Sequence, residues 1–216
     1  QAACDISVTA HKRAMSVCKV GMNESHLAAE VHHQFAVQGS ARVAYGSIVA
    51  GGDNACILHY TNNDQPLQDS DLVLIDAGCE LDHYAADITR TFPVNGRFTA
   101  PQKAIYELVL AAHQAALGVI KPGAPFSAMQ DAAVAVMTQG LLDLGLLEGT
   151  LENNIDEQSY RQYYMHNIGH WLGMDVHDVG IYKIDGESRP LEVGMVTTVE
   201  PGLYIDPEDE TIDPQW

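Results

Sequence analysis

Acidic side chains stand in or directly after apolar, strand-like runs at three places in the chain. Asp76 ends the run 72–75, Asp87 lies in the run 86–92, and Glu200 follows Val199. Pro201 favours extended backbone at Glu200. Each acid alone could be an ordinary turn or surface residue. Three together need an explanation, because a buried carboxylate must be paired or must coordinate a metal. Oxygen-rich ligand sets suit hard or borderline divalent ions, so the pattern predicts a metal site.

The first two acids are expected to face each other. If residues 71–78 and 84–92 form a hairpin that turns near Leu81 and Asp82, Asp76 and Asp87 lie opposite one another. Their Cβ atoms would then be about 5 Å apart. Like charges at that distance repel unless a cation lies between them.

Histidines gather in a second segment, where His166, His170 and His177 fall within twelve residues. The spacing of the first two copies that of a helical zinc protease, but Asn167 stands where such enzymes need Glu. Nearby glycines also disfavour a helix, so we reject that interpretation. Five other histidines on expected helices are interpreted as ordinary core or surface residues: His11, His26, His32, His33 and His113.

The bulk composition excludes some functions. The 216 residues are 46% hydrophobic, which is enough for one globular domain. Lys and Arg total 11 against 29 Asp and Glu, and a formal charge of -18 would repel nucleic acid but suits bound cations. No apolar run approaches the roughly 20 residues of a membrane span. Four scattered cysteines suggest a reducing compartment, so we expect a soluble cytoplasmic chain without membrane or nucleic-acid partners.

Apolar residues at helical spacing predict four helices, over residues 3–18, about 27–35, 99–116 and 127–144. Thr99 with Gln102 and Ser127 with Gln130 are expected to cap the last two helices. Strands are expected at 72–75, 88–92 and 196–199. Five residues of 14–25 recur in 116–127 at a constant offset of 102, which indicates a duplicated half. Helices followed by strands, twice, predict an α+β fold.

Several motifs, in this order along the chain, resemble the aminopeptidase P family, whose members share the pita-bread fold. They are residues 56–60 (CILHY), 73–78 (VLIDAG), 87–93 (DITRTFP), 166–180 and 198–204 (TVEPGLY). The resemblance implies two pseudo-symmetric halves of helices packed on a curved, mostly antiparallel sheet. Residues 1–216 would form the metallopeptidase catalytic domain. We expect it to be truncated at the C-terminus, because the family's last glutamate ligand has no match before Trp216, and Glu208 and Glu210 do not fit that motif. The N-terminal domain of many relatives is expected to be absent.

The resemblance also implies the site and its reaction. Asp76, Asp87, His170 and Glu200 would bind two divalent ions, with Asp87 bridging them. Manganese is the ion implied, although cobalt, iron or zinc can occupy such a set. A metal-bridging hydroxide would attack the bond between an N-terminal residue and a following proline, with Glu200 moving the proton. The resemblance places His59, His166 and His177 around the substrate. The substrates would be peptides with proline second, and the full-length form would be a homo-oligomer.

Two alternatives remain open. Prolidase shares the metal ligands but acts only on dipeptides, so the ligands do not separate it from an aminopeptidase. The same fold also serves as a binding module in proteins that have lost their metal ligands. For this chain an inactive, metal-poor module is ranked below the enzyme, because four ligand positions are intact.

Overall fold

The computed structural model describes residues 1–206, 208–209, 212–213 and 216. The chain divides into two compact units, which are taken one at a time. The first unit contains residues 1–99 and 172–178, and the second contains 100–171 and 179–216. Within the described residues, no helix is both long and apolar enough to cross a membrane.

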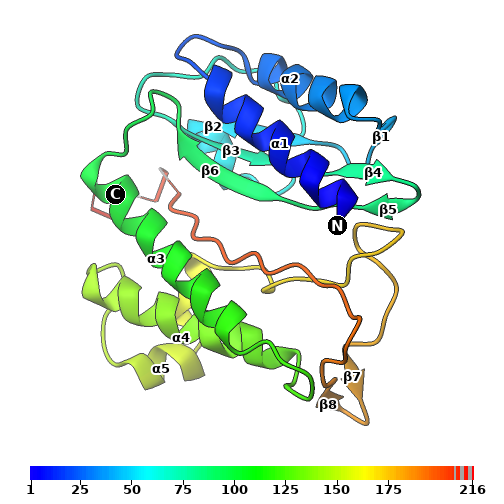
Figure 1. Cartoon of the computed structure of the whole chain (residues 1–216). Coiled ribbons are helices and arrows are strands. Elements are labelled where there is room, and N and C mark those ends of the chain that lie inside the picture. The colour runs from blue at the N-terminus through cyan, green and yellow to red at the C-terminus, as the bar shows by residue number, and fades with distance from the viewer. Residues whose placement is uncertain (207, 210–211, 214–215) are drawn as a thin grey trace. The chain divides into compact units, whose positions relative to one another are not determined.

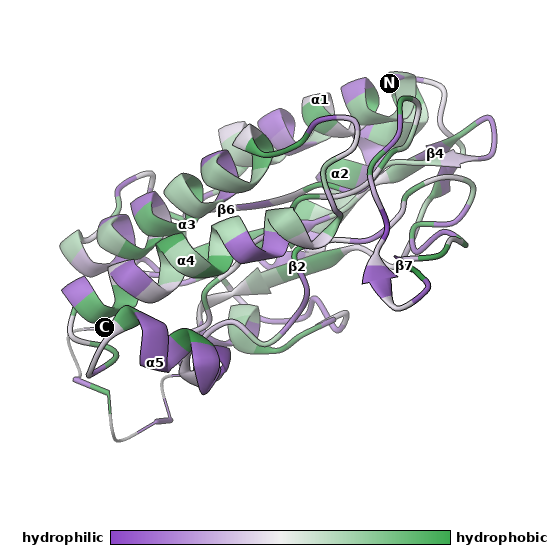
Figure 2. Ribbon diagram, turned by 90° about the horizontal axis from the view of Figure 1, so that it is seen from below, coloured by the Kyte–Doolittle hydropathy of each residue, from purple (hydrophilic) through white to green (hydrophobic). Residues whose placement is uncertain are grey.

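Two helices, α1 (Ala2–Val17) and α2 (Glu24–Val37), pack against the strands of the first unit (Figure 1). Apolar residues at helical spacing are buried in both helices, with Ala10 and Ala14 from α1 and Leu27 and Val31 from α2 fully buried. Green and purple alternate along α1 in Figure 2, as expected for a helix with one apolar side.

The strands of the first unit form two antiparallel sheets. One has the order β2-β3-β6 and the other the order β1-β4-β5. The first comprises β2 (Ile48–Gly51), β3 (Leu72–Asp76) and β6 (Thr89–Pro93). The second comprises β1 (Arg42–Val43), β4 (Cys79–Leu81) and β5 (Tyr84–Ala85), and the 3-10 helix η1 (Gly52–Cys56) follows β2.

The predicted hairpin is present, but it is interrupted. Its tip is a turn at Asp82 and His83, which have φ values of 51° and 66°. Between the paired segments the two backbones approach closely at Gly78, where an added Cβ would lie 1.6 Å from the Ala86 carbonyl oxygen. Only glycine fits this close backbone approach. The register consequently places Asp76 opposite Thr89, so the expectation of two directly opposed aspartates is wrong in register.

The second unit is built mainly from helices. They are α3 (Ala100–Gly118), α4 (Ser127–Asp143), α5 (Leu151–Asp156) and the 3-10 helix η2 (Ser159–Gln162), with a small antiparallel hairpin of β7 (Lys183–Ile184) and β8 (Glu187–Ser188). The core includes Met129, Met137, Leu141, Tyr164 and Ile168. The chain therefore combines helices with antiparallel strands, as the α+β prediction required.

Two local predictions in the second unit are wrong. Ser127 is the first residue of α4 and not its cap, and the hydroxyl of Ser188 accepts the Ser127 amide at 2.9 Å instead. Gln130 does not cap either, because its side-chain oxygen accepts bonds from Tyr164 and Ile168. The strand expected at 196–199 is reduced to an isolated bridge between Thr197 and Trp171 in the described structure.

The repeated residues occupy similar turns in the two units. Gly21 and Gly123 both have positive φ, at 79° and 88°. Each donates its amide to a buried leucine carbonyl at 2.8 Å, from Gly21 to Leu67 and from Gly123 to Leu191. The offset of 102 residues therefore corresponds to a shared local conformation.

Candidate metal centre

Two carboxylates of the first unit meet at one tyrosine. The hydroxyl of Tyr45, in the segment between β1 and β2, lies 2.5 Å from Asp76 Oδ1 and 3.0 Å from Asp87 Oδ1. Both aspartates are half-buried. The structure thus brings the two predicted ligands together through a residue that the sequence pattern did not reveal.

This acidic pair suits a cation. A hydroxyl has only one proton to donate, so it cannot neutralise two carboxylates held this closely. Burial, followed by the charges of Asp76 and Asp87, raises the pKa of Tyr45 well above its usual value. Tyr45 therefore stays protonated and serves as a donor.

The backbone around Gly78 positions this pair. Ala77 donates to the Ile88 carbonyl at 3.1 Å, and Ala86 donates to the Cys79 carbonyl at 2.9 Å. These bonds continue the hairpin through the stretch between its two regular ladders. Asp87 is therefore fixed by a paired backbone although it lies outside the named strands.

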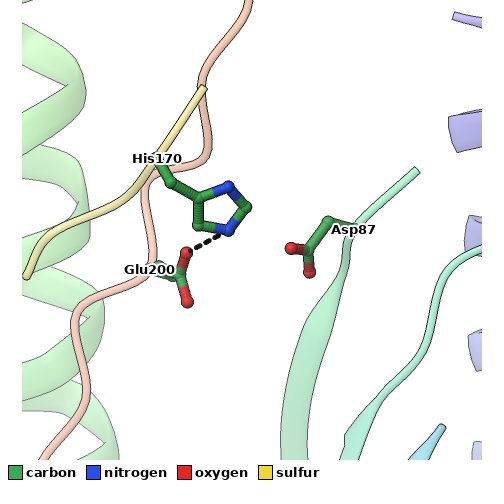
Figure 3. A group of neighbouring side chains, drawn as sticks. All are labelled: Asp87, His170 and Glu200. Atoms are coloured by element: carbon green, nitrogen blue, oxygen red, sulfur yellow. Dashed lines mark ion pairs between the residues drawn. The ribbon is translucent and has the colours of Figure 1, made fainter. Parts of the chain in front are cut away.

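A histidine and a glutamate of the second unit face each other (Figure 3). Nε2 of His170 lies 3.1 Å from Glu200 Oε1. The other ring nitrogen, Nδ1, lies 3.0 Å from the Trp171 carbonyl oxygen and must donate to it. In the neutral ring, Nε2 then presents a lone pair to a carboxylate. That contact is favourable only with a proton or a cation between the two groups.

Thr198 orients both members of this pair. Its hydroxyl accepts the His170 amide at 2.9 Å and donates to Glu200 Oε1 at 2.7 Å. The backbones run side by side, because Thr198 donates to the His170 carbonyl and Glu200 donates to that of Ile168. At Gly169 an added Cβ would lie 2.2 Å from the Thr198 carbonyl oxygen. Thr198 was not singled out from the sequence, although its period-two spacing from Glu200 was a usable signal.

His166 lies in an aromatic cluster of the second unit. Its Nε2 accepts the Tyr204 hydroxyl at 3.0 Å, and its Nδ1 donates to the Asn167 carbonyl at 2.9 Å. Tyr164 and Tyr204 approach the ring edge-on, with centroid distances of 5.0 Å and 5.5 Å. His166 therefore offers a wall of ring atoms and not a metal-binding lone pair.

His59 and His177 are both exposed, and both belong to the first unit. His59 lies on a turn with a φ of 58°. His177 lies in the segment 172–178, which the Ala85 amide holds through the Gly173 carbonyl at 2.8 Å. Of the two C-terminal glutamates that the sequence analysis set aside, Glu208 is exposed and Glu210 lies outside the described residues.

Each pair fits a divalent metal by its donor types. The acidic pair of the first unit supplies two carboxylates, and the His–Glu pair of the second supplies a carboxylate and an imidazole, which are donors that suit Mn²⁺ and similar ions. Each pair brings together groups that repel, or that present lone pairs to each other, when no cation or proton is bound.

The chain is similar in sequence to curated Xaa-Pro aminopeptidases. The chain is 51% identical over 216 residues to the Xaa-Pro aminopeptidase of Haemophilus influenzae, covering 100% of this chain and 50% of that relative. It is 50% identical over 206 residues to the Xaa-Pro aminopeptidase of Escherichia coli K12, covering 95% of this chain and 46% of that relative. The chain thus spans about half the length of the curated relatives it matches.

Solved structures of aminopeptidase P match the chain at a similar level of sequence identity. Pseudomonas aeruginosa aminopeptidase PepP matches with a TM-score of 0.99 and 56% identity, over 100% of this chain and 49% of that one. Zinc-substituted Escherichia coli aminopeptidase P, solved in complex with product, matches with a TM-score of 0.95 and 49% identity, over 99% of this chain and 48% of that one. The model of metallopeptidase family M24 matches residues 1–214. This chain, with its paired acids and its His–Glu pair, belongs to metallopeptidase family M24.

Proposed function

We propose that this chain carries the catalytic machinery of an Xaa-Pro aminopeptidase, which hydrolyses the bond between an N-terminal residue and a following proline. Relatives of that name have about 50% sequence identity to the chain, which belongs to metallopeptidase family M24. The observation that carries the proposal is the pair of ligand clusters, Asp76 with Asp87 and His170 with Glu200. Membership of a metallopeptidase family supports metal binding by these residues.

The two clusters would serve one centre with two divalent ions. Asp76 and Asp87 would hold metal through their carboxylate oxygens, and His170 would contribute its Nε2, whose tautomer the Trp171 carbonyl fixes. Manganese is the proposed ion, and the ligand types also accept cobalt, iron or zinc. The zinc-substituted relative supports metal exchange in this family. Bound ions would supply Lewis acidity and a hydroxide nucleophile near neutral pH.

Glu200 is the proposed proton carrier. It would accept a proton from the attacking water and pass it towards the leaving imino nitrogen of proline. Thr198 donates to Oε1 at 2.7 Å, which holds the carboxylate in one orientation. A fixed carboxylate transfers a proton more efficiently than one that samples several rotamers.

The histidines that do not bind metal are assigned to the substrate. His59 and His177, both exposed, would donate to the oxygen that becomes negative during attack. His166 would form part of a wall for the proline ring together with Tyr164 and Tyr204, which meet it edge-on. A flat, rigid aromatic surface suits a proline ring, which has little conformational entropy to lose.

We also propose two pseudo-symmetric halves of a pita-bread fold, a homo-oligomeric full-length protein and a cytoplasmic location. The similar turns at Gly21 and Gly123 support the first of these.

The proposal is tested with the full-length protein, stripped of metal by a chelator and then supplied with Mn²⁺. A tripeptide with proline second should release its first residue only after Mn²⁺ is added, and a matched tripeptide with alanine second should stay intact. Hydrolysis of an Xaa-Pro dipeptide alone would show a prolidase. Metal binding without hydrolysis of either substrate would contradict the proposed activity.

A further inference from the structure

A buried carboxylate far from any metal ligand in the sequence lies at the start of α2. The side chain of Glu24 has a relative exposure of 0%. Removing an ionised carboxylate from water costs several kcal/mol unless hydrogen bonds replace the lost hydration. Such a residue is kept in a core only where its hydrogen bonds are satisfied.

Four donors satisfy Glu24, and all come from one segment, residues 51–65. The Gly51 amide and the Asn54 side-chain amide donate to Oε1 at 2.8 Å and 3.0 Å. The Tyr60 hydroxyl and the Gln65 amide donate to Oε2 at 2.8 Å and 3.0 Å. Hydrogen bonds to a charged acceptor are about twice as strong as neutral ones. Glu24 therefore ties the whole segment to α2 at four points.

His59 lies inside this segment. It is flanked by the Asn54 and Tyr60 contacts, and Tyr60 is its immediate neighbour in the chain. His59 has a φ of 58°, a left-handed conformation that a non-glycine residue adopts only when its surroundings hold it there. The Tyr60 side chain is buried, whereas His59 is exposed. The turn thus anchors Tyr60 in the core and exposes His59, the residue before it, to solvent.

Asn63 makes a second set of hydrogen bonds that hold the same segment. Asn63 accepts the Val49 amide at 2.8 Å and donates to the Ser47 carbonyl at 2.8 Å. These bonds join the far side of the turn to β2 and the residue before it. Glu24 and Asn63 together leave the turn at 57–60 little freedom.

We propose that Glu24 is a positioning residue for His59. This inference rests on the proposed function, in which His59 contacts the reacting substrate. The four hydrogen bonds fix the position and orientation of the turn. Glu24 affects the reaction only through that turn. Displacement of a donor by about 1 Å can cost a factor of roughly 100 in rate, so the anchor matters even though it never touches substrate.

The substitution that tests this is Glu24→Gln, which keeps the shape but replaces one acceptor oxygen with an NH2 group. Whichever oxygen the NH2 group replaces, it would face two hydrogen-bond donors, because each carboxylate oxygen of Glu24 accepts from two. We expect kcat to fall by about 10- to 100-fold while metal content stays unchanged. Amide hydrogen exchange in residues 57–61 should accelerate. Tyr60→Phe, which removes a single donor, should shift both readouts in the same direction by less.

The matched control is Glu30→Gln on the same helix. Glu30 pairs with Arg13 at a partly exposed position, so its replacement should leave both readouts unchanged. If Glu24→Gln does not fold, Tyr60→Phe carries the test, with faster exchange at 57–61 expected.

A double-mutant cycle with His59→Ala separates a positioning role from general stability. In the His59→Ala background, Glu24→Gln should cause no further loss of kcat. An equal loss in both backgrounds would overturn the proposal, as would unchanged exchange at 57–61. If His59→Ala has no effect while His170→Ala abolishes turnover, the role of His59 and this inference fail together and the metallopeptidase function stands.

Discussion

Nε2 of His170 lies 3.1 Å from Glu200 Oε1, and the side chains of the two residues are only 16% and 34% exposed. Such closeness is unfavourable for a neutral imidazole whose other nitrogen already donates to a carbonyl. The pair is therefore preorganised for a positive charge, which is the physical basis of the proposed metal site.

Loss of His170 should remove both metal and activity. His170→Ala in the full-length protein deletes the only imidazole of the proposed ligand set, so bound Mn²⁺ measured by mass spectrometry should fall together with hydrolysis. His33→Ala, at an exposed position on α2, is the control and should retain both. Full turnover in His170→Ala would refute the ligand assignment.

Thr198 should tune metal affinity. Thr198→Val removes the hydroxyl that accepts from His170 and donates to Glu200, and loss of such an orienting partner typically weakens metal binding about 10- to 100-fold. Thr9→Val is the control, because the Thr9 hydroxyl donates to the Asp5 carbonyl of its own helix. Titration of the stripped protein with Mn²⁺ measures both. Equal affinities for the two variants would contradict the role given to Thr198.

Tyr45 should act similarly on the acidic pair. Tyr45→Phe removes the hydrogen bonds to Asp76 and Asp87 but keeps the ring. We expect weaker Mn²⁺ binding, by a factor of about 10 to 100, with little change in helix content. The checks are isothermal titration and circular dichroism. Unchanged affinity would mean that the two carboxylates are oriented by their backbone alone.

Replacing His177 should slow the reaction without releasing metal. His177→Ala removes a proposed donor to the developing oxyanion, for which losses of about 100- to 1,000-fold in kcat are typical. Bound Mn²⁺ should stay near the level of the unmodified protein. Loss of metal would instead make His177 a ligand.

Gly78 should be required for stability. Gly78→Ala would place a Cβ 1.6 Å from the Ala86 carbonyl oxygen, so the hairpin must shift, at a cost of about 1–3 kcal/mol or more. Gly118→Ala is the control, because an added Cβ there meets nothing within 4 Å, and it should change stability by less than about 1 kcal/mol. Urea unfolding measures both. Equal stability of the two variants would contradict the close approach.

The sequence predicted the helices well, because packing repeats with the helical period. Ala10, Ala14, Leu27 and Val31 recur at that period, and all four are fully buried. Two of the proposed metal ligands were singled out by a different argument, since Asp76 and Glu200 follow apolar residues, whereas the role of His170 came from the family resemblance. Both signals depend only on residues that are near one another in the chain, so they can be recognised without knowledge of the tertiary structure.

What the sequence missed depends on contacts between distant residues. Tyr45 is a single tyrosine in a connecting segment, and nothing near it in the chain predicts two carboxylate partners. Glu24 resembles any acid in the first turn of a helix. The expected Ser127 cap failed because Ser188, 61 residues away, supplies the acceptor. The β-branched run at 196–199 favoured a strand, but the described structure pairs it at a single bridge.

The central claim is tested most directly by a crystal structure of the full-length protein with Mn²⁺, using anomalous diffraction at the manganese edge. Our account predicts two anomalous peaks, with Asp87 bound to both ions and Asp76, His170 and Glu200 completing the ligands. Peaks elsewhere, or side chains of these residues turned away from the ions, would contradict it.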